Sequence, residues 1–164
     1  MDPADEARTR AILDLQEGRG EVPLLDEAER LDLLRRARRI AIVGASPDRS
    51  RPSHSVMRYL QVQGYDCVPI NPLVRDVLGV PAFPSLEEAV AATGRFDIVD
   101  VFRRPEHVPA IARSAVATGC GALWLQLGVV DWEAARLARA GGLEVVMDRC
   151  TAIEHRKLRP ARRG

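Results

Sequence analysis

The 164-residue sequence has few cysteines, a single lysine and almost no net charge. Its three cysteines, Cys67, Cys120 and Cys150, are too few and too widely spaced to indicate a disulfide framework or a zinc site. The formal net charge of +1 at pH 7 gives no support for a nucleic-acid-binding protein. Lys157 is the only lysine, so nearly all the positive charge is carried by arginine.

Long apolar runs are also missing. No stretch approaches the roughly 18 apolar residues that a membrane helix needs. The first ten residues, MDPADEARTR, are acidic and polar, which is not typical of a signal peptide. The three histidines, His54, His107 and His155, share no metal-ligand spacing, so no metal site is predicted. We therefore expect a soluble, cytoplasmic protein that interacts with neither nucleic acid nor membrane.

Short apolar blocks alternate with helix-like segments from residue 40 onward. The first block, IAIVG at 40–44, is a continuous apolar run, as expected of a strand covered on both faces. Strands are expected over residues 40–44, 66–71, 80–83, 97–102, 122–126 and 143–148. Helix starts are expected at Pro52, Pro105 and Asp131, and the matching helix ends at Gly64, Gly119 and Gly141. Two capping boxes are also predicted: Ser85 with Glu88, before a helix over 86–92, and Thr151 with Glu154.

This alternation predicts an α/β fold. Right-handed βαβ units would build a Rossmann-like, doubly wound, mostly parallel sheet of five or six strands with helices on both faces. The domain is expected to span residues 40–158, and residues 159–164 would form a basic tail. Residues 1–39 would form an N-terminal extension whose last part, 26–39, is a helix packed on the sheet edge. Asp26 and Glu29 would cap this helix, and its apolar stripe would be Leu31, Leu34 and Ala37.

The turn after the first strand favours an anionic ligand. In open α/β sheets, ligands bind beyond the carboxyl ends of the strands. Gly44, Ala45 and Ser46 lead into a helix N-terminus there, and its free N–H groups and dipole favour a phosphate. The dinucleotide pattern G-x-G-x-x-G is not satisfied, because Ser46 and Arg49 replace its second and third glycines. The second strand ends in Asn71 rather than an acidic residue for a ribose hydroxyl, so NAD is disfavoured.

Four arginines, Arg49, Arg51, Arg103 and Arg104, fall in loops at the same predicted edge. Arginine can grip phosphate oxygens with two parallel hydrogen bonds. A ligand with a diphosphate and a further ribose phosphate would use such a set, and both coenzyme A and NADP fit this description. Of the adjacent pair, we expect one arginine to contact the ligand and the other to point away.

Five collinear segments span most of the chain from residue 40 to about 158. They are GASPDRSRPSHSVMRYLQVQGYDCVPINP (44–72), LGVPAFPSL (78–86), DIVDVFRRPEHVP (97–109), ALWLQLGV (122–129) and VVMDRCTAIEH (145–155). Together these segments resemble the CoA-binding domain family in its small single-domain form. The same fold forms the first domain of the α subunit of succinyl-CoA synthetase and of NDP-forming acyl-CoA synthetases.

The resemblance and the arginine pattern imply a coenzyme A site built from four loops. The first turn and the following helix start would hold the phosphates, and the end of the second strand would lie against the adenosine. The loops after the fourth and fifth strands would flank the diphosphate and meet the pantetheine arm. The expected site residues are Gly44, Ala45, Ser46, Arg51, Ser53, Asn71, Pro72, Phe102, Arg103, Arg104, Gln126 and Gly128.

No catalytic constellation is found in the sequence. We expect no phosphohistidine domain or ATP-grasp unit like those of the synthetases, and the 164 residues contain neither a P-loop nor a G-x-S-x-G elbow. The expected function is therefore non-catalytic binding of coenzyme A or a short acyl-CoA. Two alternatives stay open: an accessory protein of an acyl-CoA-handling enzyme, acting with an unknown protein partner, and an NAD(P)-binding sensor of similar fold.

Cys150 supports a further hypothesis. It follows the last strand at a predicted helix N-terminus, where a thiol pKa can fall. His155 is expected nearby. Cys150 would then form a mixed disulfide by exchange with the disulfide of oxidised coenzyme A, which releases one coenzyme A thiol, and the alternative is a buried, inert cysteine.

Overall fold

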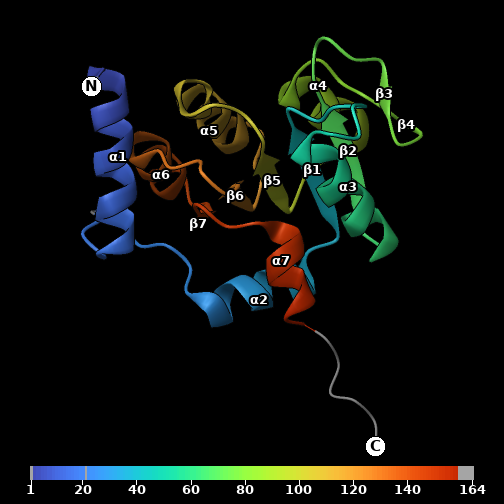
Figure 1. Ribbon diagram of the computed structural model, residues 1–164. Coiled ribbons are helices and arrows are strands. Elements are labelled where there is room, and N and C mark those ends of the chain that lie inside the picture. The colour runs from blue at the N-terminus through green and yellow to red at the C-terminus, as the bar shows by residue number, and fades with distance from the viewer. Residues whose placement is uncertain (1, 21, 159–164) are drawn as a thin grey trace, which may run out of the picture.

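A sheet of five parallel strands organises the chain in the computed structural model, which describes residues 2–20 and 22–158 (Figure 1). The strand order is β2-β1-β5-β6-β7. The strands are β1 (Arg39–Val43), β2 (Asp66–Ile70), β5 (Ile98–Val101), β6 (Ala122–Leu125) and β7 (Glu144–Val146). The predicted doubly wound α/β fold is confirmed, while the predicted tail at 159–164 lies outside the described residues.

Helices cover both faces of the sheet. One apolar cluster joins α2, α3 and α7 to one face, and another joins α4, α5 and α6 to the opposite face. The chain runs from β1 to β2 and then crosses to β5 on the other side of β1. The strand order therefore reverses between β1 and β5, where a ligand crevice is expected. The helices are α2 (Glu27–Arg36), α3 (Pro52–Val62), α4 (Leu86–Thr93), α5 (Val108–Ala117), α6 (Trp132–Ala140) and α7 (Thr151–Arg156), and a 3₁₀ turn, η1 (Pro105–His107), precedes α5.

The predicted strand at 80–83 does not join the main sheet. Its first half is β4 (Val80–Pro81), which pairs antiparallel with β3 (Asp76–Val77) in a separate small ribbon. Phe83 makes only an isolated bridge to Ile70. Proline has no N–H to donate, which restricts Pro81 to an edge position. The sheet thus has five strands rather than six.

The helix caps follow the sequence closely, with one exception. Asp26 and Glu29 form the expected reciprocal capping box of α2. The Oγ of Ser85 accepts from Glu88 N–H at 3.1 Å. The prediction of a final capping box at Thr151 and Glu154 is wrong. The N-cap of α7 is Cys150, whose side chain makes no capping hydrogen bond. Thr151 is instead turned toward the sheet and fully buried.

The N-terminal extension contains two helices. Besides α2, residues Pro3–Gln16 form α1, which the sequence did not predict. α2 packs over a face of the sheet rather than its edge and buries Arg30, Leu33 and Leu34. Leu33 therefore takes the place of Leu31 in the predicted stripe, and Ala37, also buried, is the C-cap after the helix. α1 lies beside α6 (Figure 1), where Trp132 Nε1 donates to the carbonyl of Ala11 at 3.2 Å. None of the helices in the described residues is long and apolar enough to cross a membrane.

Candidate functional site

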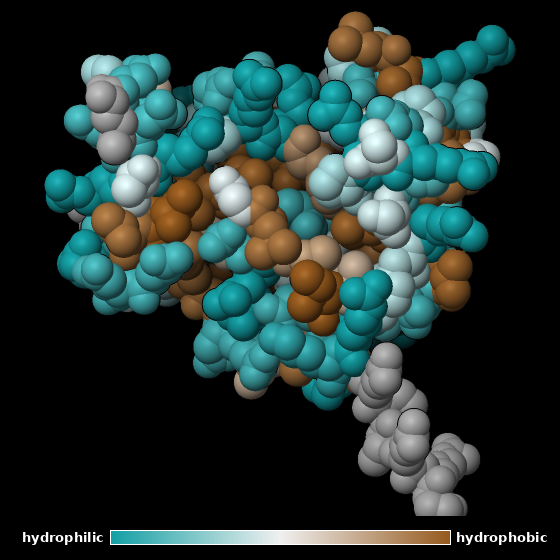
Figure 2. Space-filling view, viewed as in Figure 1, coloured by the Kyte–Doolittle hydropathy of each residue, from teal (hydrophilic) through white to brown (hydrophobic). Residues whose placement is uncertain are grey.

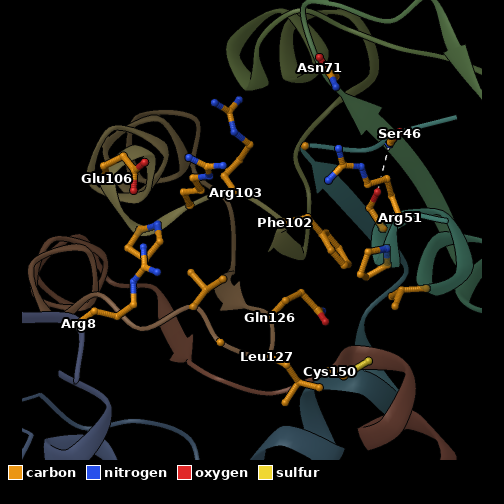
Figure 3. A pocket seen from close by; sticks show the side chains of 18 residues that line it. Arg8, Ser46, Arg51, Asn71, Phe102, Arg103, Glu106, Gln126, Leu127 and Cys150 are labelled. Carbon is orange, nitrogen blue, oxygen red and sulfur yellow. Dashed lines mark hydrogen bonds between the residues drawn. The ribbon is translucent and has the colours of Figure 1, made fainter. Parts of the chain in front are cut away.

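A cavity of about 850 Å³ opens over the carboxyl ends of the strands, where the strand order reverses (Figure 3). Figure 2 shows apolar side chains on the floor of a central hollow and hydrophilic side chains around its rim. Ten of the twelve predicted site residues line the cavity: Gly44, Ser46, Arg51, Ser53, Asn71, Phe102, Arg103, Arg104, Gln126 and Gly128. The structure thus gathers loops that are more than 80 residues apart in the chain (44 to 128) around one space.

Two predicted residues do not line this cavity. Ala45 is fully buried in the core under the first turn, because its side chain joins the cluster formed with α2, α3 and α7. Pro72 lines a neighbouring cavity of about 270 Å³. Arg103 lines both cavities, so the two spaces adjoin at this side chain.

Gly44 allows the ends of β1 and β5 to approach closely. Its φ is +83°, in the left-handed region that favours glycine. A Cβ at this position would lie 2.7 Å from the carbonyl oxygen of Phe102 and 2.9 Å from Cδ of Arg103. Phe102 is fixed in turn, because its N–H donates to the carbonyl of Val43 at 2.8 Å. The first turn and the loop that carries Phe102 and Arg103 therefore form one wall.

The N-terminus of α3 faces this wall. Its N-cap, Arg51, makes no side-chain capping bond, and Pro52 fills the first helical position. The Oγ of Ser53 accepts from the N–H of Ser46 at 3.2 Å, which closes the loop over the helix start. An uncapped helix N-terminus carries a partial positive charge that favours anions. The loop also contains an acidic group, Asp48, but its carboxylate accepts from Ser50 and does not line the cavity.

Four arginines line the cavity: Arg8, Arg51, Arg103 and Arg104. Within the described residues, none of their side chains forms a hydrogen bond or an ion pair with the protein. Of the described residues on the lining, Glu106 is the one acidic residue. The cavity is therefore markedly cationic, with guanidinium groups left available for a ligand. Arg49, in the same loop as Arg51, does not line the cavity.

Arg8 was missed by sequence reasoning. It belongs to α1 and approaches the cavity from the side opposite Ser46 and Arg51 (Figure 3). α1 has no buried residue of its own, so its sequence carries only a weak helical pattern. Its place is fixed by Ala11, Ile12 and Leu15 against the core and by the bond from Trp132.

Asn71 holds the ends of β1 and β2 together. Its Nδ2 donates to the carbonyl of Ala45 at 2.9 Å, and its Oδ1 accepts from the N–H of Leu73 at 2.9 Å. This amide has a structural task, and it also lines the cavity. Both interpretations made from the sequence, a strand-end turn and a site residue, are compatible with this geometry.

Asp100 is a second residue that the sequence analysis missed. It lies inside β5, is completely buried, and accepts hydrogen bonds from Gln126 Nε2 at 2.6 Å and Thr151 Oγ1 at 2.9 Å. Burial raises the pKa of the Asp100 carboxyl from 3.8 to about 7, while the two hydrogen bonds oppose the rise. A carboxylate within the apolar run DIVDVF was the available signal, because a buried charge needs a specific partner.

Cys150 lies on the cavity lining and is half-buried, and its thiol makes no hydrogen bond with the described residues. The expected partner, His155, is engaged elsewhere: its Nδ1 lies 2.9 Å from the hydroxyl of Tyr59, and its ring packs edge-on against Tyr59 and Tyr65. Burial lowers the pKa of His155. In the part of the chain that the structure describes, no group of three His, Cys, Asp or Glu residues is placed to hold a metal.

Comparison with known proteins adds a family and related structures. A family profile described as "CoA binding domain" matches residues 38–156. The protein YneT of Bacillus subtilis (strain 168) is 40% identical over 129 residues, which cover 79% of this chain and 93% of YneT. The solved structure of cell-free ID.343 from Thermus thermophilus is 36% identical, with a TM-score of 0.76 over 82% of this chain and all of that chain.

A larger enzyme shares the fold. The dinucleotide forming acetyl-coenzyme A synthetase 1 of Ca. Korarchaeum cryptofilum, in its apo form, matches with a TM-score of 0.57 at 21% identity. The match covers 65% of this chain and 25% of that one. At this identity the likeness concerns the fold alone.

Proposed function

The chain belongs to the CoA binding domain family, and from this premise we propose that it binds coenzyme A or a short acyl-CoA without covalent chemistry. The observation that carries the proposal is the cationic cavity at the reversal of the strand order. Its volume, about 850 Å³, lies within the range of about 300–1,000 Å³ that is usual for small-molecule sites.

The diphosphate is proposed to bind between the N-terminus of α3 and the wall formed by Gly44 and Phe102. The uncapped helix end supplies N–H groups and a favourable dipole. Arg51 and Arg103 line the same space, have no hydrogen-bond or ion-pair partner among residues 2–20 and 22–158, and supply charge-assisted hydrogen bonds to phosphate oxygens.

The two ends of the ligand would extend in opposite directions. The adenosine is proposed to occupy the smaller neighbouring cavity, where Pro72, Ile70 and Ile111 offer apolar contacts. Arg103 lies between the two cavities, suitably placed for a phosphate that links both parts. The pantetheine arm would run past Phe102 toward Gln126 and Leu127.

A ligand panel tests the proposal against the NAD(P) alternative. Coenzyme A, acetyl-CoA, dephospho-CoA, NAD and NADP would be titrated into the protein by calorimetry. We expect saturable binding of coenzyme A, weaker binding of dephospho-CoA because it lacks the ribose phosphate, and no saturation with NAD. Preferential binding of NADP would instead support the sensor alternative.

Two arginines of one loop provide a matched pair of variants. Both arginines are exposed, but Arg51→Ala removes a guanidinium that lines the cavity, whereas Arg49→Ala removes one that does not. Losing one charged hydrogen bond is expected to weaken coenzyme A binding by about tenfold or more in Arg51→Ala. Arg49→Ala should bind almost as the wild type does, and equal losses in both variants would contradict the proposed phosphate position.

A further inference from the structure

Asp100, Gln126 and Thr151 form a closed hydrogen-bonded group beneath the cavity floor. Asp100 and Thr151 are completely buried, and Gln126 is 6% exposed. Gln126 Nε2 donates to Asp100 Oδ1 at 2.6 Å and to Thr151 Oγ1 at 3.1 Å, and Thr151 Oγ1 donates to Asp100 Oδ2 at 2.9 Å. The three residues come from β5, the position directly after β6 and the first turn of α7, so tertiary packing alone brings them together.

The hydrogen-bond donors and acceptors of Asp100, Gln126 and Thr151 determine the orientation of the Gln126 side-chain amide. A carboxylate only accepts hydrogen bonds, and a side-chain amide has two N–H donors on one atom. Both donors of Gln126 are used inward, toward Asp100 and Thr151. The amide oxygen, Oε1, accepts no bond from the described residues and is not among their buried, unpartnered atoms. Because Gln126 lines the cavity, this oxygen is the atom available to a ligand (Figure 3).

We propose that Asp100 and Thr151 are positioning residues that hold the Gln126 oxygen toward the cavity, so that the site selects a ligand with an N–H donor at this point. The inference rests on the proposed function, in which that donor is an amide N–H of the pantetheine arm. A buried acceptor of fixed direction discriminates strongly, because a ligand without a matching donor leaves it unpaired.

The ionisation of Asp100 sets this orientation. Burial places the pKa of the carboxyl at about 7, so both forms are populated near neutral pH. When protonated, the carboxyl offers a donor, and Gln126 can then turn its oxygen inward and its NH₂ group toward the cavity. The carboxylate form therefore matches an N–H ligand, and binding of such a ligand should release protons from Asp100.

Other ionisable groups on this face of the sheet do not replace Asp100 in this role. Cys67 on β2 stays a neutral thiol, because burial raises its pKa to about 12. Arg30 of α2 and Glu154 of α7 pair with each other at 3.3 Å. Among the described residues of α2, α3 and α7, the other buried titratable side chain is His54 of α3, and it is not a hydrogen-bond partner of Asp100. The hydrogen-bond partners of the Asp100 carboxyl among all the described residues are Gln126 and Thr151 alone.

The test is calorimetric titration of coenzyme A between pH 6 and 8 in buffers of different ionisation enthalpy. For the wild type we expect affinity to rise with pH and about half a proton to be released per site at pH 7. Asp100→Asn should lose this extra proton release and bind about three- to tenfold more weakly above pH 7, because asparagine permits either amide orientation. Thr151→Val should bind more weakly but retain the proton release.

A matched control is Asp66→Asn, which removes an exposed carboxylate paired with Arg39 at the opposite end of the sheet. It should keep the wild-type affinity and pH profile, and thermal melting would verify that every variant is folded. Identical proton release and affinity in wild type and Asp100→Asn would overturn the inference while leaving the proposed function intact. Failure of the wild type and of Asp66→Asn to bind coenzyme A would refute the proposed function and the inference with it.

Discussion

Replacing Gly44 by alanine is expected to destabilise the protein by about 2–4 kcal/mol, clearly more than the same change at Gly64. Both glycines have positive φ, +83° and +96°. An L-residue in the left-handed region costs roughly 1–2 kcal/mol at either position. Only Gly44 has a second cost, because its Cβ would lie 2.7 Å from the Phe102 carbonyl oxygen, whereas no atom lies within 4 Å of the Cβ at Gly64.

The clash at Gly44 is with backbone that cannot easily move. The N–H of Phe102 is bound to the carbonyl of Val43, and β5 is a central strand of the sheet. Urea denaturation of Gly44→Ala and Gly64→Ala, with unchanged denaturant dependence, gives the two losses directly. Equal losses would refute the argument that the first turn and the Phe102 loop are packed into one wall.

Three further predictions follow from single side chains. Asp100→Asn should change how the free energy of unfolding depends on pH. In the wild type, the pKa of Asp100 is higher in the folded state, about 7, than in the unfolded state, near 3.8. This difference stabilises the fold fully below pH 3.8, and the contribution, up to about 4 kcal/mol, is lost as pH rises through 7. Between pH 5 and pH 8, urea denaturation should therefore show a larger decrease in the free energy of unfolding for the wild type than for the variant. Equal decreases in the two proteins would contradict a raised pKa of Asp100 in the folded state. Arg8→Ala should weaken coenzyme A binding by about two- to fivefold in calorimetry, without a change in melting temperature, because its guanidinium lines the cavity and pairs with no described residue. Gly20→Ala would bring a Cβ within 1.9 Å of the Trp132 ring, so limited proteolysis should cleave the first 20 residues faster than in the wild type.

Local patterns were sufficient to predict the framework of the fold. Continuous apolar runs such as 40–44 and 122–126 correspond to buried strands, and caps such as Asp26 and Asp131 mark helix starts. The carboxyl-edge rule predicted that the loops after these strands would meet, and ten of the twelve predicted residues line one cavity there, because the rule depends only on the parallel order of the strands.

The missed features depend on contacts between distant parts of the chain. Asp100 is hydrogen-bonded to Gln126 and Thr151, which lie 26 and 51 residues later in the sequence. The pattern of a strand does not indicate which distant residue will donate to a buried carboxylate. The same contact explains the wrong capping box, since the Thr151 hydroxyl turns toward the sheet instead of the helix N-terminus. α1 was missed because it is positioned by Trp132, more than 100 residues later, rather than by a strong apolar stripe of its own.

Calorimetric titration of coenzyme A into the wild-type protein tests the central claim most directly. The account predicts one saturable site per chain, with dephospho-CoA weaker and NAD giving no saturation. Absence of saturation by coenzyme A at millimolar concentration, with a folded protein, would contradict it.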